Sequence, residues 1–299
     1  MDAPETPLFA LAHASDIHFG AIDEPRVVAA LVDDINAAAV DLVCVSGDLT
    51  QRARAREFAA ARDMLGRFAA PHLVVPGNHD VYQWWNPFKR LFKPLRRYRR
   101  EISADLSPAF ETSREGATLA ALGINSAHGR TRKGGRISSA MRAAMQAFFG
   151  PKPPGTFKVL VLHHHLTRLR ALGHHDVSRK ATRTLALAQA LGVDLILCGH
   201  LHVSHVEAVG TGTPPSEPVP EAPGAPVPGT VETSGSRARR VVIASAGTAT
   251  SSRGRGKHRL TNFYNRIYVY ADRFEIVERR FDPAAGAFVT TETRAFARV

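Results

Sequence analysis

The sequence predicts an α/β protein arranged as a four-layer α/β/β/α sandwich, with two mixed sheets facing each other and helices on their outer faces. Short apolar runs alternate with helix-like segments over the first two-thirds of the 299 residues. These runs lack a regular polar alternation, which is typical of strands covered on both faces. The C-terminal part differs, because apolar runs with tight turns follow one another there. Together these patterns favour packed layers around a common core.

The expected elements follow a regular order along the chain. Strands are predicted over 9–15, 41–48, 72–80 (including a loop), 117–125, 157–165 and 193–200, and helices over 25–40, 54–68, 138–150 and 181–192. Pro25 suits the first turn of the first helix, and Ser138 and Gly150 are typical start and stop residues of the third. The last strands are predicted over 239–247, 265–272 and 273–282, with Asp272 in a turn.

Composition narrows the classes of protein. No stretch approaches the roughly 20 apolar residues of a membrane-spanning helix, and the N-terminus lacks the basic start and apolar core of a signal peptide. Cys44 and Cys198 each lie inside an apolar run, so a disulfide framework is not expected. We therefore expect a soluble, cytoplasmic protein with one domain over 1–299. The sequence leaves its oligomeric state open.

Two segments depart from the alternating pattern. Residues 82–102 form an insert rich in aromatic and basic residues, and residues 210–236 form a Pro/Gly-rich segment that is expected to be a flexible loop. The net charge of +12 favours anionic partners, or reflects arginines used for solubility. Residues 82–100 would contact an anionic membrane or a nucleic acid, or else cap the core with buried aromatics and solvated arginines.

Five polar motifs lie at the ends of predicted strands. They are Asp16-Ile-His18, Gly47-Asp48, Gly77-Asn78-His79-Asp80, His163-His164-His165 and Gly199-His200-Leu201-His202. Sites in open α/β sheets form beyond the carboxyl ends of the strands, so these side chains should meet at one rim. Carboxylate, imidazole and amide ligands suit divalent Mn, Fe or Zn.

Spacing and neighbouring glycines add to this prediction. In Asp-x-His and His-x-His the two ligands are two residues apart, and on an extended segment they would project to the same side. The glycines beside Asp48, Asn78 and His200 would let the backbone turn sharply and approach the ions. Each motif alone is weak, but all five in this order at strand ends favour one metal site.

The order D-x-H, GD, GNHD, H, GHxH resembles the calcineurin-like metallophosphoesterase superfamily, and within it the bacterial class III cyclic-nucleotide phosphodiesterases. The resemblance runs from about Ala14 to the strands after Ala246. It implies that one metal ion is held by Asp16, His18 and His202, that the other is held by Asn78, His163 and His200, and that Asp48 bridges them. It also implies that His79 lies near the leaving group, with Asp80 able to orient it, and that the fold is the four-layer sandwich.

The chemistry expected of such a pair is hydrolysis of a phosphate ester. Two close cations polarise the phosphoryl oxygens and lower the pKa of a bridging water, whose hydroxide attacks phosphorus. His79 as an imidazolium would stabilise the developing charge or protonate the leaving group. The segment HHHLTRL lacks the prolines that the family often has, so His163 or His164 can be the ligand; we expect His163, which directly ends its strand. His165, His174 and His175 are expected outside the ligand set.

The substrate is expected to be a small phosphate ester, most simply a nucleotide such as 3′,5′-cyclic AMP. Asn125 is a candidate for lining the pocket, and Arg253, in the basic segment 251–259, for contacting substrate phosphate. Two alternatives remain open: a membrane-peripheral lipid-phosphate or pyrophosphate hydrolase or nuclease of the same superfamily, and a non-catalytic scaffold that retains the fold.

Overall fold

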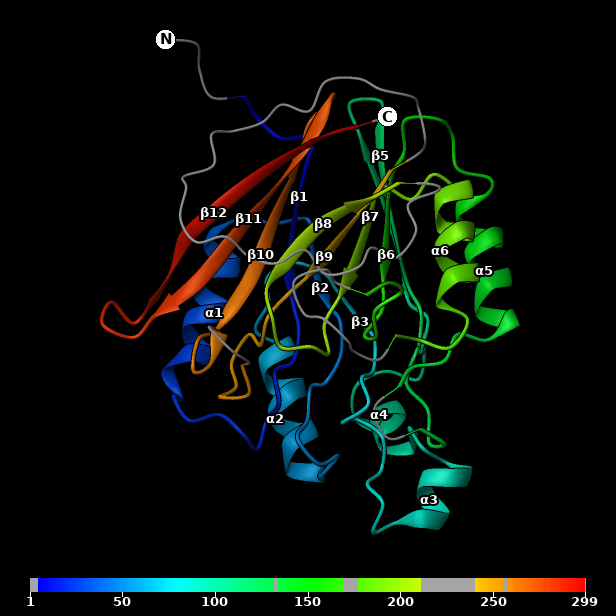
Figure 1. Ribbon diagram of the computed structural model, residues 1–299. Helices are drawn as coiled ribbons and strands as arrows, with labels where there is room; N and C mark the ends of the chain where they lie inside the picture. Colours follow the sequence, from blue (N-terminus) through cyan, green and yellow to red (C-terminus); the bar gives the residue numbers. More distant parts are fainter. Residues whose placement is uncertain (1–4, 132–133, 169–176, 211–239, 255–257, 299) are drawn as a thin grey trace, which may run out of the picture.

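The computed structural model describes residues 5–131, 134–168, 177–210, 240–254 and 258–298. Within these ranges the strands form two sheets (Figure 1). The first contains, in spatial order, β12 (Ala287–Ala297), β11 (Arg273–Asp282), β10 (Phe263–Val269), β1 (Phe9–Ala14), β2 (Leu42–Val45) and β3 (His72–Val74). The second contains β4 (Ala109–Arg114), β5 (Ala117–Gly123), β6 (Phe157–Val161), β7 (Leu195–Cys198), β9 (Val241–Ser245) and β8 (His205–Val209).

Both sheets are mixed, as the sequence predicts. In the first sheet β1, β2 and β3 run parallel, whereas β10, β11 and β12 form an antiparallel extension beside β1. In the second sheet β5, β6, β7 and β9 run parallel, with β4 and β8 antiparallel at the two edges. The parallel strands of each sheet therefore deliver their carboxyl ends to one edge, which is the lower edge in Figure 1.

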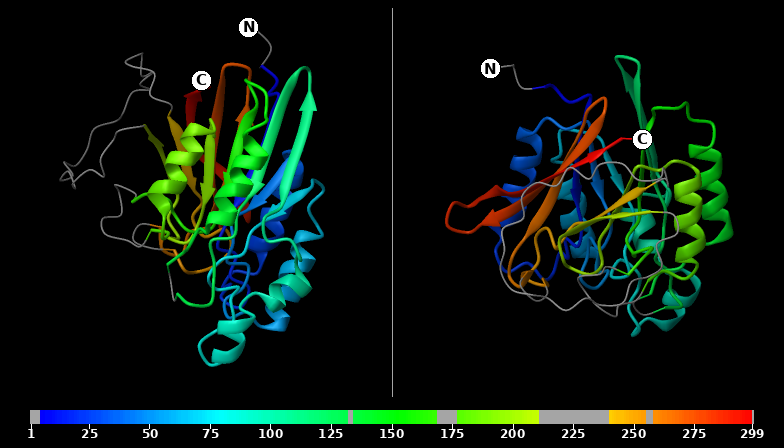
Figure 2. Two further views of the ribbon diagram at one scale, coloured as in Figure 1. Left: turned by 90° about the vertical axis from the view of Figure 1, so that its right-hand side faces the viewer. Right: turned by 45° about the horizontal axis from the view of Figure 1, so that its top comes forward.

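Helices cover the two outer faces and complete four layers. α1 (Arg26–Ala37) and α2 (Ala55–Leu65) pack on the first sheet, and α5 (Ser139–Phe149) and α6 (Ala181–Ala190) pack on the second. Figure 2 shows these helix pairs on opposite sides of the stacked sheets. The predicted cap of α5 is confirmed, since Ser138 Oγ accepts a hydrogen bond from the Met141 amide at 3.2 Å and Gly150 follows the last turn.

Alternate residues of the same strand enter different cores. On β1, Phe9 and Leu11 lie in the core between the sheets, whereas Ala10, Ala12 and Ala14 lie in the core under α1 and α2. Successive side chains of a strand point to opposite faces, so a strand buried on both sides needs an unbroken apolar run. This is the physical reason for the continuous apolar segments in the sequence.

Three strands were not predicted, and the capping helix considered for the insert is present as two short helices. The strands β4, β8 and β12 lie at the edges of the sheets, and nearly all of their positions are half-buried or exposed. A polar, half-solvated edge strand lacks the apolar run that identifies the central strands. The helices α3 (Pro87–Phe92) and α4 (Arg96–Glu101) are short and occupy the insert.

The expectation that the aromatics of the insert pack on the core is wrong for most of them. Trp84, Trp85 and Phe88 are exposed, while Arg90 is buried. The insert is attached through other groups, including Tyr98 of α4, whose buried hydroxyl donates to the Val74 carbonyl oxygen at 3.0 Å. A ring with a polar tip is stable inside when that tip has a partner.

Some predictions fall outside the described ranges. They are the Pro/Gly-rich loop expected over 210–236, of which only Gly210 is described, and the positions of His174 and His175. None of the helices in the described ranges has the length and hydropathy needed to cross a membrane.

Candidate metal centre

The structure brings the five polar motifs together at the carboxyl ends of parallel strands. Each motif directly follows its strand: Asp16 and His18 follow β1, Asp48 follows β2, Asn78 and His79 follow β3, His163 follows β6, and His200 and His202 follow β7. Two of these strands belong to the second sheet, so the site is built where the edges of both sheets meet. Adjacent parallel strands end at the same edge, which explains why residues remote in sequence converge.

One cluster contains two carboxylates and two imidazoles. Ligand atoms of Asp16, His18, Asp48 and His202 all lie within 4.8 Å of one another, and all four residues are buried. Asp16 Oδ1 is 3.2 Å from His202 Nε2 and 3.5 Å from His18 Nε2. This is a compact set of donors with the chemistry of a divalent metal site.

A second cluster adjoins the first through Asp48. Ligand atoms of His163, His164 and His200 lie within 4.8 Å of one another. Asn78 Oδ1 is 3.2 Å from His163 Nε2 and 2.9 Å from His200 Nδ1. Asp48 Oδ2 is 3.3 Å from His163 Nε2 and 3.7 Å from His18 Nε2, so this carboxylate lies between the two clusters.

Each carboxylate is held by one oxygen and presents the other to the histidines. Asp16 Oδ2 accepts hydrogen bonds from Ser15 Oγ at 2.7 Å and from the His200 amide at 2.9 Å, and Asp48 Oδ1 accepts from the His79 amide at 2.7 Å. The other oxygens, Asp16 Oδ1 and Asp48 Oδ2, are buried and accept no hydrogen bond in the described structure. A buried carboxylate oxygen without a donor is costly unless a cation satisfies it, so the site fits divalent metal ions.

The imidazole rings are oriented by main-chain carbonyl groups. In three of the predicted ligand histidines Nδ1 lies within hydrogen-bond distance of a carbonyl oxygen, so Nδ1 carries a proton and Nε2 faces the carboxylates. The pairs are His18 with Thr50 at 3.3 Å, His163 with Ser46 at 2.8 Å, and His202 with Arg253 at 3.0 Å. Such outer contacts fix the tautomer and direction of a ligating histidine.

The backbone around the site adopts unusual conformations. Five of the ten non-glycine residues with positive φ in the described chain belong to these motifs: Asp16, His18, Asp48, His200 and His202. Left-handed backbone is unfavourable for residues with a Cβ, and it is concentrated at functional sites. The two pairs of ligands at i, i+2 are therefore not on extended segments, and that part of the sequence interpretation is wrong. Left-handed residues at alternate positions turn the chain so that both side chains of each pair face the centre.

Close approach of the backbone explains two of the glycines. A Cβ at Gly77 would overlap Asp48 Oδ1, and one at Gly199 would overlap Ser15 Oγ. The first displaced side chain is a carboxylate of the site, and the second is the hydrogen-bond donor of the other carboxylate, Asp16. The close approach that these glycines allow is therefore to the carboxylate Asp48 and to the donor of Asp16, whereas the sequence predicts an approach to the ions.

Burial and mutual attraction shift the protonation of the cluster. Burial disfavours charge on Asp48, but attraction by His163 and other histidines outweighs it and holds the pKa of Asp48 well below its usual range. For His163, burial is outweighed by Asp48, and the pKa rises to about 9. For His18, burial dominates and lowers the pKa to about 4. The two carboxylates therefore supply negative charge to the site.

His79 lies beside the clusters, and its ring contacts are not with Asp80. Its Nδ1 is 2.8 Å from the Gln51 carbonyl oxygen, and its Nε2 is 3.1 Å from Arg253 Nη1. Asp80 instead accepts hydrogen bonds from the amides of Leu49, Thr50 and Gly77 and from Thr50 Oγ1. It thereby joins the loops after β2 and β3 and acts on His79 only through the backbone.

Asn125 lies next to the insert. Its Oδ1 accepts from the Ala127 amide at 2.8 Å. It lines a pocket of about 490 Å³ together with residues of α3, α4 and the segments beside them. The full lining is Phe92, Lys93, Pro94, Leu95, Arg96, Arg99, Leu106, Asn125, Ala127 and His128.

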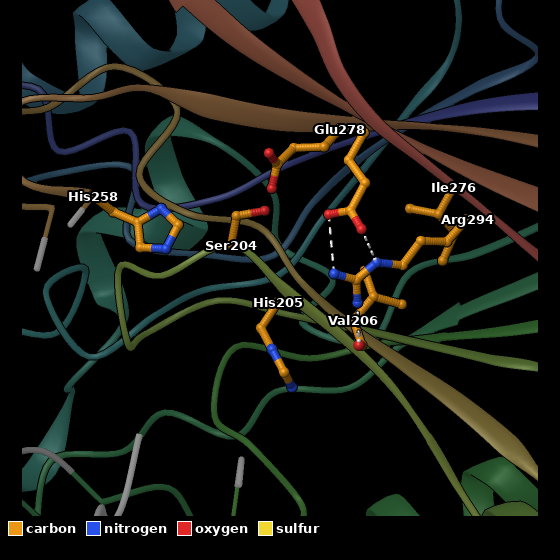
Figure 3. Close-up of a pocket in the computed structure, with 8 residues that line it drawn as sticks. Ser204, His205, Val206, His258, Ile276, Glu278 and Arg294 are labelled. Carbon is orange, nitrogen blue, oxygen red and sulfur yellow. Dashed lines mark hydrogen bonds and ion pairs between the residues drawn. The ribbon is translucent and has the colours of Figure 1, made fainter. Parts of the chain in front are cut away.

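A smaller pocket of about 150 Å³ lies beside β8, β11 and β12 (Figure 3). It contains charged groups, but Arg294 is paired with Glu292 at 2.6 Å and donates to the Val206 carbonyl oxygen at 2.8 Å. Among the described residues that line it, none belongs to the five motifs. This pocket is therefore separate from the metal-binding clusters.

Sequence reasoning missed the residues that orient the site through main-chain groups. Gln51 is one example, since its carbonyl oxygen holds His79 and its Oε1 accepts from Arg253 Nη1 at 2.8 Å. Ser15, which donates to Asp16, is another. A contact made by a carbonyl group leaves no signature in the residue type, although the position of Ser15 next to the Asp-x-His motif was an available signal.

The sequence is similar to known proteins. Residues 9–204 match the family model described as "Calcineurin-like phosphoesterase". A segment of 80 residues is 40% identical to the glycerophosphodiester phosphodiesterase GpdQ of Enterobacter lignolyticus; it covers 23% of this chain and only 29% of that protein.

Two solved structures share the fold at low sequence identity. A dimetal phosphatase from Danio rerio aligns with a TM-score of 0.60 at 12% identity, covering 98% of this chain and 100% of that one. The purple acid phosphatase PPD1 of yellow lupin, Lupinus luteus, also aligns with a TM-score of 0.60 at 12% identity, covering 98% of this chain and 54% of that one. At this identity the likeness establishes the four-layer fold.

Proposed function

Because the chain belongs to the calcineurin-like phosphoesterase family, whose members are dinuclear metal-dependent hydrolases, we propose that it is a phosphodiesterase acting on a small phosphodiester such as a cyclic nucleotide. The observation that carries this proposal is the position of Asp48. Its free oxygen lies between the cluster with His18 and the cluster with His163, so Asp48 could serve as a ligand of both cations.

The residues form two ligand sets around Asp48. One ion would be held by Asp16, His18 and His202, and the other by Asn78, His163 and His200. His163 is the better ligand of the two candidates in its motif, because its Nε2 faces both Asp48 and Asn78, whereas His164 Nδ1 is 2.8 Å from Ser126 Oγ. The mixed oxygen and nitrogen donors suit Mn, Fe or Zn.

The bound ions would supply Lewis-acid activation of the phosphate and of the attacking water. The chain supplies orientation and charge around them. Main-chain carbonyls fix the rings, and the amides of His79 and His200 fix the carboxylates. Ordered ligands of this kind require no reorganisation during the reaction.

In this proposal His79 and Arg253 would act on the substrate beside the ions. The Gln51 carbonyl oxygen contacts His79 Nδ1. The other ring nitrogen of His79, Nε2, lies next to the Arg253 guanidinium. A guanidinium can bind a phosphate oxygen, and an imidazolium that carries a proton on Nε2 can donate it to a departing alkoxide and become neutral. We assign substrate binding to Arg253 and leaving-group stabilisation to His79.

A diester substrate is supported by the relative that matches a segment of this chain, which is named a glycerophosphodiester phosphodiesterase. The net charge of +12 also favours an anionic substrate. These observations support a phosphodiester as the substrate class.

The proposal is tested with purified full-length protein loaded with Mn, Fe, Zn, Co or Ni. Hydrolysis of bis-p-nitrophenyl phosphate, p-nitrophenyl phosphate, 3′,5′-cyclic AMP and a glycerophosphodiester is compared. We expect the diesters to be cleaved faster than the monoester, and Asn78→Ala to abolish the activity. Preference for the monoester with every metal would reject a phosphodiesterase, and absence of all hydrolysis would reject the catalytic assignment itself.

A further inference from the structure

The exposed apolar side chains of the described chain gather in one short segment. Phe88 and Phe92 are 78% and 77% exposed, which is more than any other large apolar residue described. Five of the six such side chains lie between residues 84 and 92: Trp84, Trp85, Phe88, Leu91 and Phe92. We call these five residues the α3 patch. A contiguous group of exposed apolar residues indicates an interaction surface.

The helix α3 is oriented opposite to an ordinary amphipathic surface helix. Its buried residue is Arg90, which is 2% exposed. Arg90 Nη1 donates to the Tyr82 carbonyl oxygen at 2.5 Å and Nη2 to the Thr131 carbonyl oxygen at 2.6 Å. The three apolar residues at spacing i, i+3 and i+4 lie on the opposite face and are exposed: Phe88, Leu91 and Phe92. The arginine thus fixes the helix with its apolar face outward.

Basic side chains surround the α3 patch. Exposed cationic residues lie on α3, on α4 and between them: Lys89, Lys93, Arg96, Arg99 and Arg100. The single acidic residue between 82 and 102, Glu101, already pairs with Arg62 at 3.0 Å and with Arg100 at 2.5 Å. An apolar face with a cationic rim is complementary to an anionic lipid surface.

We propose that the α3 patch docks the protein on an anionic membrane surface. Aromatic residues beside cations also bind single-stranded nucleic acid, but two features favour lipid. Leu91 offers no ring for a base to stack on, and the Arg90 guanidinium lies 4.3 Å from the Trp84 ring centroid and covers one of its faces. Trp, Phe and Leu with nearby Lys and Arg are typical of segments in the interfacial region of a bilayer.

The patch lies on the same side of the molecule as the strand ends that carry the metal centre (Figures 1 and 2). Phe92, Lys93 and Arg96 also line the 490 Å³ pocket, whose other wall includes Asn125. Docking through α3 would therefore bring this pocket to the level of the lipid headgroups. The docking surface itself does not depend on the proposed phosphodiesterase activity.

Tryptophan fluorescence can test this proposal directly. The only two tryptophans of the chain are Trp84 and Trp85, and both belong to the patch, at 46% and 62% exposure. Vesicles of phosphatidylcholine mixed with phosphatidylglycerol should shift the emission of the full-length protein to shorter wavelength and co-sediment with it. Vesicles of phosphatidylcholine alone should do so much less, because the cationic rim has no partner there.

Variants separate the apolar and electrostatic contributions. Phe88→Ser combined with Phe92→Ser should weaken partitioning by about tenfold or more, because both rings lose contact with the lipid. Lys93→Gln and Arg96→Gln should each weaken vesicle partitioning by about fivefold. This effect should be smaller at high salt, because salt screens the attraction to the lipid. Matched controls are Leu260→Ser, at the other exposed large apolar residue, and Arg280→Gln, at an exposed cation on β11.

Three outcomes would overturn the proposal. The first is unchanged vesicle binding by the Phe88→Ser, Phe92→Ser double variant. The second is a tryptophan shift produced by single-stranded oligonucleotides and not by anionic vesicles, which would assign the patch to nucleic acid. The third is a shift that grows with protein concentration without vesicles, which would assign it to a second copy of the chain. Circular dichroism of each variant verifies folding, so a loss of binding cannot be attributed to unfolding.

Discussion

Arg253 Nη1 lies 3.1 Å from His79 Nε2, although 174 residues separate the two positions in the sequence. Gln51 joins them, because its carbonyl oxygen is 2.8 Å from His79 Nδ1 and its Oε1 accepts from the same Arg253 nitrogen at 2.8 Å. The three residues therefore form one unit beside the metal-binding clusters.

This unit predicts coupled effects on catalysis. Arg253→Gln should lower kcat/KM for a diester by about tenfold to a hundredfold through loss of a charge-assisted contact. His79→Asn should lower kcat by about a hundredfold or more. In the double variant, the loss of transition-state stabilisation should be smaller than the sum of the losses in the two single variants, since the residues contact each other. Additive losses, or a metal content that falls in either variant, would contradict the assignment; Arg280→Gln is the control.

Asp48 should be the residue whose loss removes both ions. Asp48→Asn keeps the shape of the side chain and an oxygen for the His79 amide, but it removes the charge between the clusters. We expect the content of both ions, measured by inductively coupled plasma mass spectrometry, to fall. The activity should fall by about a thousandfold or more. Asp33→Asn, at a carboxylate 75% exposed on α1, should leave both unchanged. Retention of two ions by Asp48→Asn would refute a shared ligand.

The fold class was predictable because the central strands carry a strong physical signal. Strands such as β1 and β6 are buried on both faces, and this requires apolar runs that are visible in the sequence. The edge strand β12 was missed for the opposite reason: most of its residues are exposed, so its sequence resembles a loop.

The site was predictable in its residue types and not in its local geometry. Asp16 and His18 were identified from their motif, but their left-handed backbone, with φ of 54° and 51°, is imposed by the surrounding fold. The sequence also did not reveal that the apolar face of α3 is exposed. Its sequence reads as a helix with apolar and basic residues, and only the contacts of Arg90 with two carbonyl oxygens reveal which side is buried.

Two glycines give a test of how tightly the backbone must approach the carboxylates. Gly199→Ala would place a methyl group against Ser15 Oγ, which donates to Asp16. We expect a destabilisation of about 1–3 kcal/mol in thermal unfolding and weaker metal binding in calorimetry. Gly134→Ala is the matched control, because its added Cβ meets no atom within 4 Å. Equal behaviour of the two variants would show that Asp16 tolerates displacement.

His13 should make the fold sensitive to acid. It is fully buried on β1, its Nε2 is 2.9 Å from Ser46 Oγ, and its Nδ1 has no hydrogen-bond partner in the described structure. Burial lowers its pKa from 6.5 to about 3. Between these values the unfolded chain binds a proton that the folded chain does not. The free energy of unfolding therefore falls as the pH decreases from about 6.5 to about 3, and this contribution is fully present above that window.

Replacing His13 tests this sign directly. In chelator, denaturant unfolding of His13→Leu should show a shallower loss of stability between pH 6.5 and pH 3 than the wild type, because one titrating group has been removed from the unfolded chain. Ser46→Ala is the control, since it removes the hydrogen-bond partner of His13 and keeps the titration. It should lower stability by about 1 kcal/mol at every pH. Parallel curves for His13→Leu and the wild type would mean that His13 is protonated in the folded state.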